Sequence, residues 1–583
     1  MTQISLNLIT KSLPLSNKQV INKPSTPNLS NPEISTAFAT PSSKLMHVYF
    51  TGRVEEEPKI QGHPKLQKFI DWSLSEAKIS NEKAAANESD GWKIYIPEIT
   101  KVQQPTGFRK AENDHTIELF NKSFKGFTWT GEECSDPTVK VDGQDKRWDS
   151  LELINLYDPE VRKKHIEELN DLGINNIRLG IQMSKIPEKT PEFVNIVKDF
   201  HDAGLKVALD LQHFGLPDSL KDKDNSEKSI YLNPKMPEVY KNYVKDNIGK
   251  YYDNVEALTI INEPLVTNKL SGVFWNECAP GNEGHPDFKR LFANRAINMA
   301  KAAVSARIEI EKYAKDNNKP EKVFIHNESC EHQPWNDDFN DHIRFLGSDL
   351  ILGQDWLLKS KFDKVESYSP EVLKDKPEMF AWMAKNAVNH EYKNENGEVL
   401  YDSKTINELQ TKDYNNLVDG LNEVKGLHEK LNKETNGKTM KSNTVFGLDY
   451  YVACEYGPNL CQDFRYYNDE ILEGSRHGLY KIAINLFDRY QMPFLHTETN
   501  LNPELGPKML LQSSTESAQA AKSGVPFLGI NWYSLIDQYG WGRGLNVDPE
   551  KAKEHPWPVG LLSPTFERRP VAKTIKDIAE ATK

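Results

Sequence analysis

Cysteine is scarce in this 583-residue sequence, and the way it is distributed excludes two common architectures. The five cysteines, Cys134, Cys278, Cys330, Cys454 and Cys461, are an odd number and show no paired spacing typical of structural metal sites. We therefore expect neither a disulfide framework nor a metal centre, and we expect no cofactor. A reducing cytoplasm fits this cysteine usage best, with export by a signal-independent route left open.

Long apolar runs and excess positive charge are missing as well. No run approaches the roughly 20 residues of a membrane span. The N-terminus, residues 1–6, lacks a basic region followed by a long apolar segment, so we expect no secretory signal. The net charge is −12, from 85 acidic and 73 basic residues, and no basic patch is interleaved with aromatics. Neither nucleic acid nor a membrane is therefore an expected partner.

The sequence does contain a repeated alternation of strand and helix patterns from about residue 107 onward. Helical patterns such as those of residues 159–172 and 476–491 separate most of the apolar segments. Predicted strands are 124–130, 174–180, 205–211, 255–262, 323–327, 445–452, 493–498 and 527–533. Eight strands alternating with helices predict an α/β fold, the (β/α)8 TIM barrel.

Three regions are expected along the chain. Residues 1–45, rich in Ser, Thr, Asn and Pro, predict a disordered N-terminal tail. Residues 46–106 predict a small N-terminal extension or cap, and residues 107–583 predict the barrel. A charged, helical stretch at about 354–443 lies between the fifth and sixth strands. A solvated helical excursion and a substrate lid are both open interpretations of this insertion.

Two of the predicted strands have a glutamate at or next to their carboxyl end. The fourth is followed by Asn262-Glu263-Pro264, and the seventh ends at Glu498. Because proline favours extended geometry in the residue before it, we expect Glu263 to be extended, at the last position of its strand. The carboxyl ends of barrel strands meet at one mouth, so we expect the two carboxylates to face each other.

Two carboxyl groups that face each other are the catalytic groups that hydrolysis of a glycosidic bond requires. A protonated one donates to the leaving oxygen, and an ionised one attacks the anomeric carbon or activates water. For either glutamate alone, the plainer interpretation is a residue that caps a strand-to-helix loop. Their pairing favours a glycosidase.

Motifs at the predicted strand ends resemble glycoside hydrolase family 1. Residues 259–264 (TIINEP) resemble the family's acid/base signature T(F/L)NEP, and residues 497–500 (TETN) its nucleophile signature TENG. Further matches are residues 178–181 (RLGI for RFSI), 211–218 (LQHFGLPD for LYHWDLPQ), 447–451 (GLDYY for GINYY) and 532–537 (WYSLID for WSLLD, with one insertion). The resemblance spans about residues 124–565.

The resemblance implies roles for the residues around the two carboxylates. Glu498 would be the nucleophile, with Arg178 and Tyr451 beside it, because a nearby cation and a hydrogen-bond donor favour the ionised form. Glu263 would be the acid/base, kept protonated by the charge of Glu498 until the covalent intermediate forms.

Other matched residues would bind the sugar. Asn262 would hold the 2-hydroxyl, His213 the 3-hydroxyl, and Trp532 would form an aromatic platform, with Trp541 beyond it. Each has a structural alternative, such as an interior histidine for His213 or a core aromatic for Trp532.

Departures from the family concern the sugar-binding residues. Gly540 stands where the family has a Glu that grips the 4- and 6-hydroxyls, so a plain terminal glucose or galactose is not the expected substrate. We hypothesise that Arg543 or a residue of the insertion replaces that Glu. Asp449 also replaces a family Asn.

The sequence therefore predicts a retaining β-glycosidase, an O-glycosyl hydrolase that acts on a carbohydrate by double displacement through a covalent glycosyl-enzyme intermediate. A transglycosylase with the same residues and a catalytically silent glycan-binding protein are the alternatives. The sugar, the linkage and the oligomeric state stay open.

Overall fold

The structure, a computed structural model, covers most of the chain beyond residue 59. It describes residues 60–100, 102, 108–132, 138–141, 144–147, 149–180, 190–213, 216, 220, 230–270, 288–333, 336–388, 400–451, 454–455, 478–539, 551, 553–554 and 556–583. The predicted tail lies outside these residues, as do Gly540, Trp541 and Arg543. The expected division at residues 46–106 and 107–583 stays a prediction.

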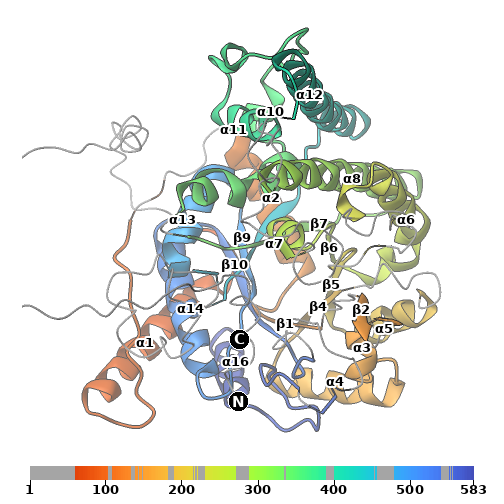
Figure 1. The fold of residues 1–583 in the computed structure, drawn as a ribbon. Helices are drawn as coiled ribbons and strands as arrows, with labels where there is room; N and C mark the ends of the chain where they lie inside the picture. Colours follow the sequence, from red (N-terminus) through yellow and green to blue (C-terminus); the bar gives the residue numbers. More distant parts are fainter. Residues whose placement is uncertain are drawn as a thin grey trace, which may run out of the picture. The chain divides into compact units, whose positions relative to one another are not determined.

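Eight parallel strands close into a barrel in the order β1-β10-β9-β8-β7-β6-β5-β4 (Figure 1). They are β1 (Thr128–Glu132), β4 (Asn176–Gly180), β5 (Lys206–Asp210), β6 (Ala257–Thr259), β7 (Val323–Ser329), β8 (Thr444–Asp449), β9 (Phe494–Glu498) and β10 (Phe527–Tyr533). A separate antiparallel pair, β2 (Thr138–Val141) and β3 (Gln144–Arg147), follows β1. The predicted barrel is confirmed, and each barrel strand falls on one of the eight predicted segments.

Helices flank the barrel strands along the chain and cover them. They are α2 (Phe108–Ser123), α3 (Ser150–Leu153), α4 (Pro159–Leu172), α5 (Thr190–Asp202), α6 (Met236–Tyr251), α7 (Pro264–Leu270), α8 (Phe288–Asp316), α9 (Arg344–Leu352), α13 (Gly478–Tyr490), α14 (Gly506–Lys522) and α16 (Pro570–Ala581). Short turns of 3-10 helix lie at η4 (Ile230–Leu232) and η5 (Tyr252–Asn254), and η6 (Phe339–Ile343) is a π-helical turn that leads into α9. Among the described residues, no helix is both long and apolar enough to cross a membrane.

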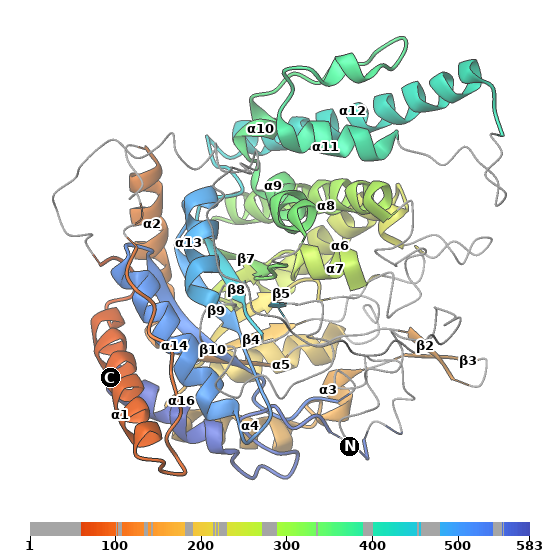
Figure 2. The same ribbon diagram turned by 60° about the vertical axis from the view of Figure 1, so that its left-hand side comes forward.

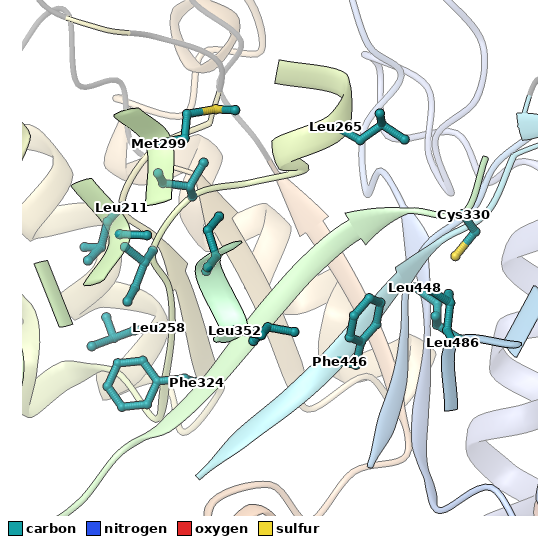
Figure 3. Packing of buried hydrophobic residues seen from close by; sticks show 14 of the residues in the cluster. Leu211, Leu258, Leu265, Met299, Phe324, Cys330, Leu352, Phe446, Leu448 and Leu486 are labelled. Atoms are coloured by element: carbon teal, nitrogen blue, oxygen red, sulfur yellow. The ribbon is translucent and has the colours of Figure 1, made fainter. Parts of the chain in front are cut away.

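The core lies mainly between the strands and this outer ring of helices. Strands such as β7 and β10 are buried along their whole length, as expected of parallel strands covered on both faces. Figure 3 shows part of this layer, with Phe324, Phe446 and Leu448 on strands and Leu352 and Leu486 on helices. This packing fixes the strand ends that carry the polar residues described below.

The N-terminal extension packs on the barrel's outer ring. Helix α1 (Leu66–Ala85) lies against α14, and the extended residues 92–99 follow it (Figure 2). Gln512 of α14 pairs with the backbone of Tyr95 through both halves of its amide, at 2.9 Å each, and Asn81 of α1 pairs with Ile94 in the same way at 2.7 and 2.9 Å. Side-chain amides thus replace a neighbouring strand.

The predicted insertion is helical. It contains α10 (Asp355–Leu358), the 3-10 turn η7 (Pro370–Leu373), α11 (Glu378–Ala387) and α12 (Ser403–Glu434). Both ribbon views show α11 and α12 stacked outside α8 (Figures 1 and 2). A Cβ on Gly420 of α12 would meet Ile297 of α8 at 3.1 Å, so the two helices approach closely. This packing favours a helical excursion over a lid.

Candidate active site

Arg178, on β4, is fully buried and contacts groups at or just beyond the ends of β5, β6 and β9. Its guanidinium lies 2.6 Å from Asp210 Oδ2 of β5, donates to Asn262 Oδ1 at 2.6 Å, and forms an ion pair with Glu498 Oε1 of β9. Burial alone would raise the pKa of Asp210, but Arg178 and His213 outweigh it, and the pKa lies below its usual value. One planar cation therefore fixes two carboxylates and an amide.

Both carboxylate oxygens of Glu498 accept hydrogen bonds from charged or strongly donating groups. Arg178 donates to Oε1, and the Tyr451 hydroxyl, just beyond the end of β8, donates to Oε2. Glu498 is 4% exposed, so little water competes for these oxygens. The arrangement stabilises the carboxylate and holds it in one orientation.

Glu263 lies in the turn between β6 and α7, and its backbone differs from the sequence prediction. Strand β6 ends at Thr259, and Glu263 has a φ of 38°, which is left-handed and not extended. The reason is the immediate start of α7 at Pro264. The Glu263 N–H donates to Asn327 O of β7 at 3.1 Å, while its carbonyl already accepts from Thr267 N at 2.8 Å. Such a strained backbone persists only where its surroundings hold it.

The carboxyl groups of Glu263 and Glu498 face the same space, together with a third from Asp449. One carboxylate oxygen from each of the three residues lies within 4.8 Å of the other two. Burial and the charge of Glu498 raise the pKa of Asp449 well above its usual value. Asp449 is therefore neutral where an ordinary aspartate is charged, and it resembles the Asn that it replaces.

Three clustered carboxylates are also a possible cation site, so their existing partners matter. Both oxygens of Glu498 already accept hydrogen bonds from Arg178 and Tyr451. A guanidinium in this position supplies the positive charge that a metal ion would otherwise bring. The donor set thus fits a metal poorly.

Asn262 and His213 are both connected to Arg178, Asn262 directly and His213 through Asp210. Asn262 Oδ1 accepts from Arg178 and from Asn327, whereas its Nδ2 is buried and has no partner among the described residues. His213 Nδ1 lies 3.3 Å from Asp210 Oδ2. An unsatisfied buried donor beside two carboxylates is suited to bind a substrate oxygen.

Trp532 lies away from this cluster. Its indole is fully buried, its N–H donates to Val559 O at 2.9 Å, and a Cβ on Gly506 of α14 would meet the ring at 3.4 Å. Consecutive residues of a strand point to opposite faces, so Tyr533 points the other way. Without the assumed insertion, Tyr533-Ser534-Leu535-Ile536-Asp537 matches the family's WSLLD at three of five positions and puts Tyr533 in the place of the family Trp.

The structure brings together Arg178, Asn262, Glu263, Tyr451 and Glu498, with His213 joined through Asp210. It adds Asp210 and Asn327, which the sequence prediction did not include in the site, and Asp449, which the sequence prediction noted only as a departure from the family. Asp210 and Asn327 are at or next to the end of a predicted strand, and this sequence signal could have singled them out. Trp541 lies outside the described residues.

Comparisons with known proteins give one family match and several structural neighbours. The sequence matches the family described as glycosyl hydrolase family 1 over residues 163–453, and a search of curated proteins gives no match. The structure resembles a β-glucosidase from Thermotoga maritima in complex with glucoimidazole, at 16% identity and a TM-score of 0.50, over 79% of this chain and 99% of that one. The same enzyme in complex with deoxynojirimycin matches at 16% identity and a TM-score of 0.49, over 79% and 98%.

At these identities the structural likeness shows the fold alone. The family match goes further, because it includes Arg178, Asn262, Glu263 and Tyr451 in their order along the barrel. The chain therefore belongs to glycosyl hydrolase family 1 and is a glycosidase built on a (β/α)8 barrel.

Proposed function

We propose that this protein is a retaining β-glycosidase in which Glu498 is the nucleophile and Glu263 the acid/base. The observation that carries the proposal is the environment of Glu498, whose two carboxylate oxygens accept hydrogen bonds from a buried arginine and a tyrosine. These donors stabilise the carboxylate that attacks the sugar. Glu263 lies in the turn before α7, with a carboxylate oxygen within 4.8 Å of one of Glu498, so we assign it the acid/base role.

The spacing supports retention of configuration. Retaining enzymes keep their carboxyl groups about 5–5.5 Å apart. Inverting enzymes keep them about 6.5–9.5 Å apart, because a water must fit between the base carboxylate and the sugar. Here oxygens of Glu263 and Glu498 lie within 4.8 Å of each other. That distance leaves room for direct attack on the anomeric carbon.

The reaction then proceeds in two displacements. Glu498 attacks the anomeric carbon while the glycosidic bond breaks, and Glu263 gives its proton to the departing oxygen. In the second step Glu263 takes a proton from water, the water oxygen bonds to the anomeric carbon, and the ester to Glu498 breaks. Both carboxyl groups return to their starting protonation states.

The substrate is proposed to be a carbohydrate whose terminal unit is not plain glucose. Gly540 carries no side chain at the position where the family has its sugar-gripping Glu. We propose that Asn262 and His213 bind sugar hydroxyls, and that Tyr533 is the aromatic platform in place of Trp532. Asn262 is supported by its unpartnered Nδ2, and Tyr533 by the alternation of side chains along β10.

A panel of aryl β-glycosides tests the function, with Glu498→Gln as the matched variant. We expect turnover of at least one member, and a loss of about 10⁴-fold or more in Glu498→Gln, because the amide cannot form the glycosyl ester. Absence of turnover across the panel, or an active Glu498→Gln, would contradict the proposal.

A further inference from the structure

Glu328, on β7, is a buried carboxyl group that takes no part in the proposed reaction. It is 2% exposed and accepts hydrogen bonds from three donors. Its Oε1 accepts from Leu265 N at 3.1 Å and from Ser329 N at 2.9 Å, and its Oε2 accepts from the Ser348 hydroxyl at 3.0 Å. A buried carboxyl group needs such partners, but these ones lie on three different elements.

Two of those elements meet behind Glu263. Leu265 is the second residue of α7, only two residues after Glu263, and Asn327, the neighbour of Glu328, accepts the Glu263 N–H at 3.1 Å. The end of β7 thus holds the chain on both sides of the left-handed residue. Because helix α7 starts at Pro264, fixing its first turn also fixes the direction of the Glu263 side chain.

Helix α9 closes the same turn from behind. Ser348 donates to Glu328 and lies 2.8 Å from His326 Nε2, so its hydroxyl is held by two groups of β7. The preceding residue, Gly347, lets α9 approach so closely that an added Cβ would lie 3.1 Å from Pro264 Cβ. A side chain here would push against the residue that follows Glu263.

We infer that Glu328, Ser348 and Gly347 form a clamp whose role is to position Glu263 as the acid/base of the proposed glycosidase. The inference rests on the proposed function, since it gives Glu263 a direction that matters only for proton transfer. Glu328 is a positioning residue: it contacts the backbone of α7 and not the reacting atoms. Misplacement of a catalytic group by about 1 Å costs on the order of 10²-fold in rate.

The test compares two substrates that differ in their need for an acid. The phenol of a phenyl glycoside departs only with a proton from Glu263, whereas the dinitrophenolate of a dinitrophenyl glycoside departs without one. In Glu328→Ala, we expect kcat/KM for the phenyl glycoside to fall about 10- to 100-fold, and for the dinitrophenyl glycoside less than about threefold. Azide should raise kcat of this variant on the dinitrophenyl glycoside, because hydrolysis of the intermediate also needs Glu263.

Two further variants keep the test independent of folding. Gly347→Ala leaves every buried polar group in place and should shift Pro264, so it should show the same selective loss. Glu328→Gln keeps an oxygen for Leu265 and Ser329 and an N–H for Ser348, so it should retain most of the activity on both substrates. Equal losses on the two substrates in Glu328→Ala and Gly347→Ala would overturn the inference.

Glu132 provides a matched control on the other side of the barrel. It ends β1, is fully buried, accepts from Ile536 N at 2.8 Å, and burial raises its pKa to about 8, as it does for Glu328. Glu132→Ala should affect both substrates by the same factor. A selective loss in this control would also overturn the inference. A wild-type protein that turns over neither substrate would instead contradict the proposed function itself.

Discussion

At Arg178, one guanidinium serves Asp210, Asn262 and Glu498 at once, and we predict that lysine cannot replace it. An ammonium is a point charge without the planar fork, so at least one partner loses its donor. We expect Arg178→Lys to lower kcat/KM about 100-fold and the free energy of unfolding by about 3 kcal/mol.

The matched control is Arg568→Lys, whose partners Glu168 and Asp171 lie at the surface. Its activity should be unchanged and its free energy of unfolding within about 0.5 kcal/mol of wild type. Wild-type activity in Arg178→Lys would contradict the central role of the guanidinium.

Asp449 gives a prediction with a definite sign in pH. Burial raises its pKa well above the usual value, so the folded protein keeps a proton that the unfolded chain releases. Stability from this group is therefore present below the unfolded pKa and is lost as pH rises toward the folded pKa. Asp449→Asn removes the loss, so the variant should gain stability relative to wild type on going from pH 4 to 7. Denaturant midpoints of the variant and of wild type at both pH values measure this gain. An equal difference between the two proteins at pH 4 and at pH 7 would contradict the prediction.

The residues of the site were predictable to different degrees. Motifs identified Glu263, Glu498, Arg178 and Tyr451 because each lies at or near the end of a strand. The predicted sugar platform, Trp532, packs its indole near Gly506 of α14, and a shift of one residue along a strand inverts the direction of the side chain. The left-handed φ of Glu263 was not predicted, because it depends on the start of α7 and on a hydrogen bond to Asn327 of another strand, which local sequence does not show.

At the scale of elements, buried apolar runs predicted all eight barrel strands, and the helical insertion was expected between the correct two. The attachment of residues 92–99 to α14 was not predictable. It rests on side-chain amides of Asn81 and Gln512 that bond to backbone groups, and no local pattern in the sequence marks such pairs.

That attachment predicts the effect of Gln512→Leu. The change leaves the Tyr95 N–H and C=O without their partners, at a cost of about 1–3 kcal/mol in the free energy of unfolding. It should also expose residues 92–99 to proteases. Gln67→Leu, on the exposed face of α1, is the control and should change stability by less than about 0.5 kcal/mol. Equal effects of the two substitutions would show that the amide pair does not hold this segment.

For the whole molecule, two classes of buried groups predict a stability maximum near about pH 6.5. Burial lowers the pKa of His165 and His428 to about 4 and of His326 and His496 to about 3. Their depressed values give stability that is present above the unfolded pKa and lost as pH falls through about 6.5 toward 4.

Glu132 and Glu328 act in the opposite sense. Burial raises the pKa of each to about 8, so their contribution is lost as pH rises through that value. Between pH 6.5 and 8 the histidines no longer titrate, and the free energy of unfolding should fall by a few kcal/mol, about 1.4 per pH unit for each glutamate. His428→Leu should flatten the acid side and Glu132→Gln the alkaline side. A stability that rises from pH 6.5 to 8 would contradict this balance.

The assignment of roles to the two glutamates is tested most directly by the stereochemistry of azide rescue on an activated aryl glycoside. In Glu498→Ala, azide should fill the hole left by the nucleophile and attack once, giving a glycosyl azide of inverted configuration. In Glu263→Ala, the covalent intermediate should accumulate because no base activates water, and azide should release it as the adduct of retained configuration. Opposite anomers from the two variants are the predicted result. The same anomer from both would contradict the assignment of Glu498 as nucleophile and Glu263 as acid/base.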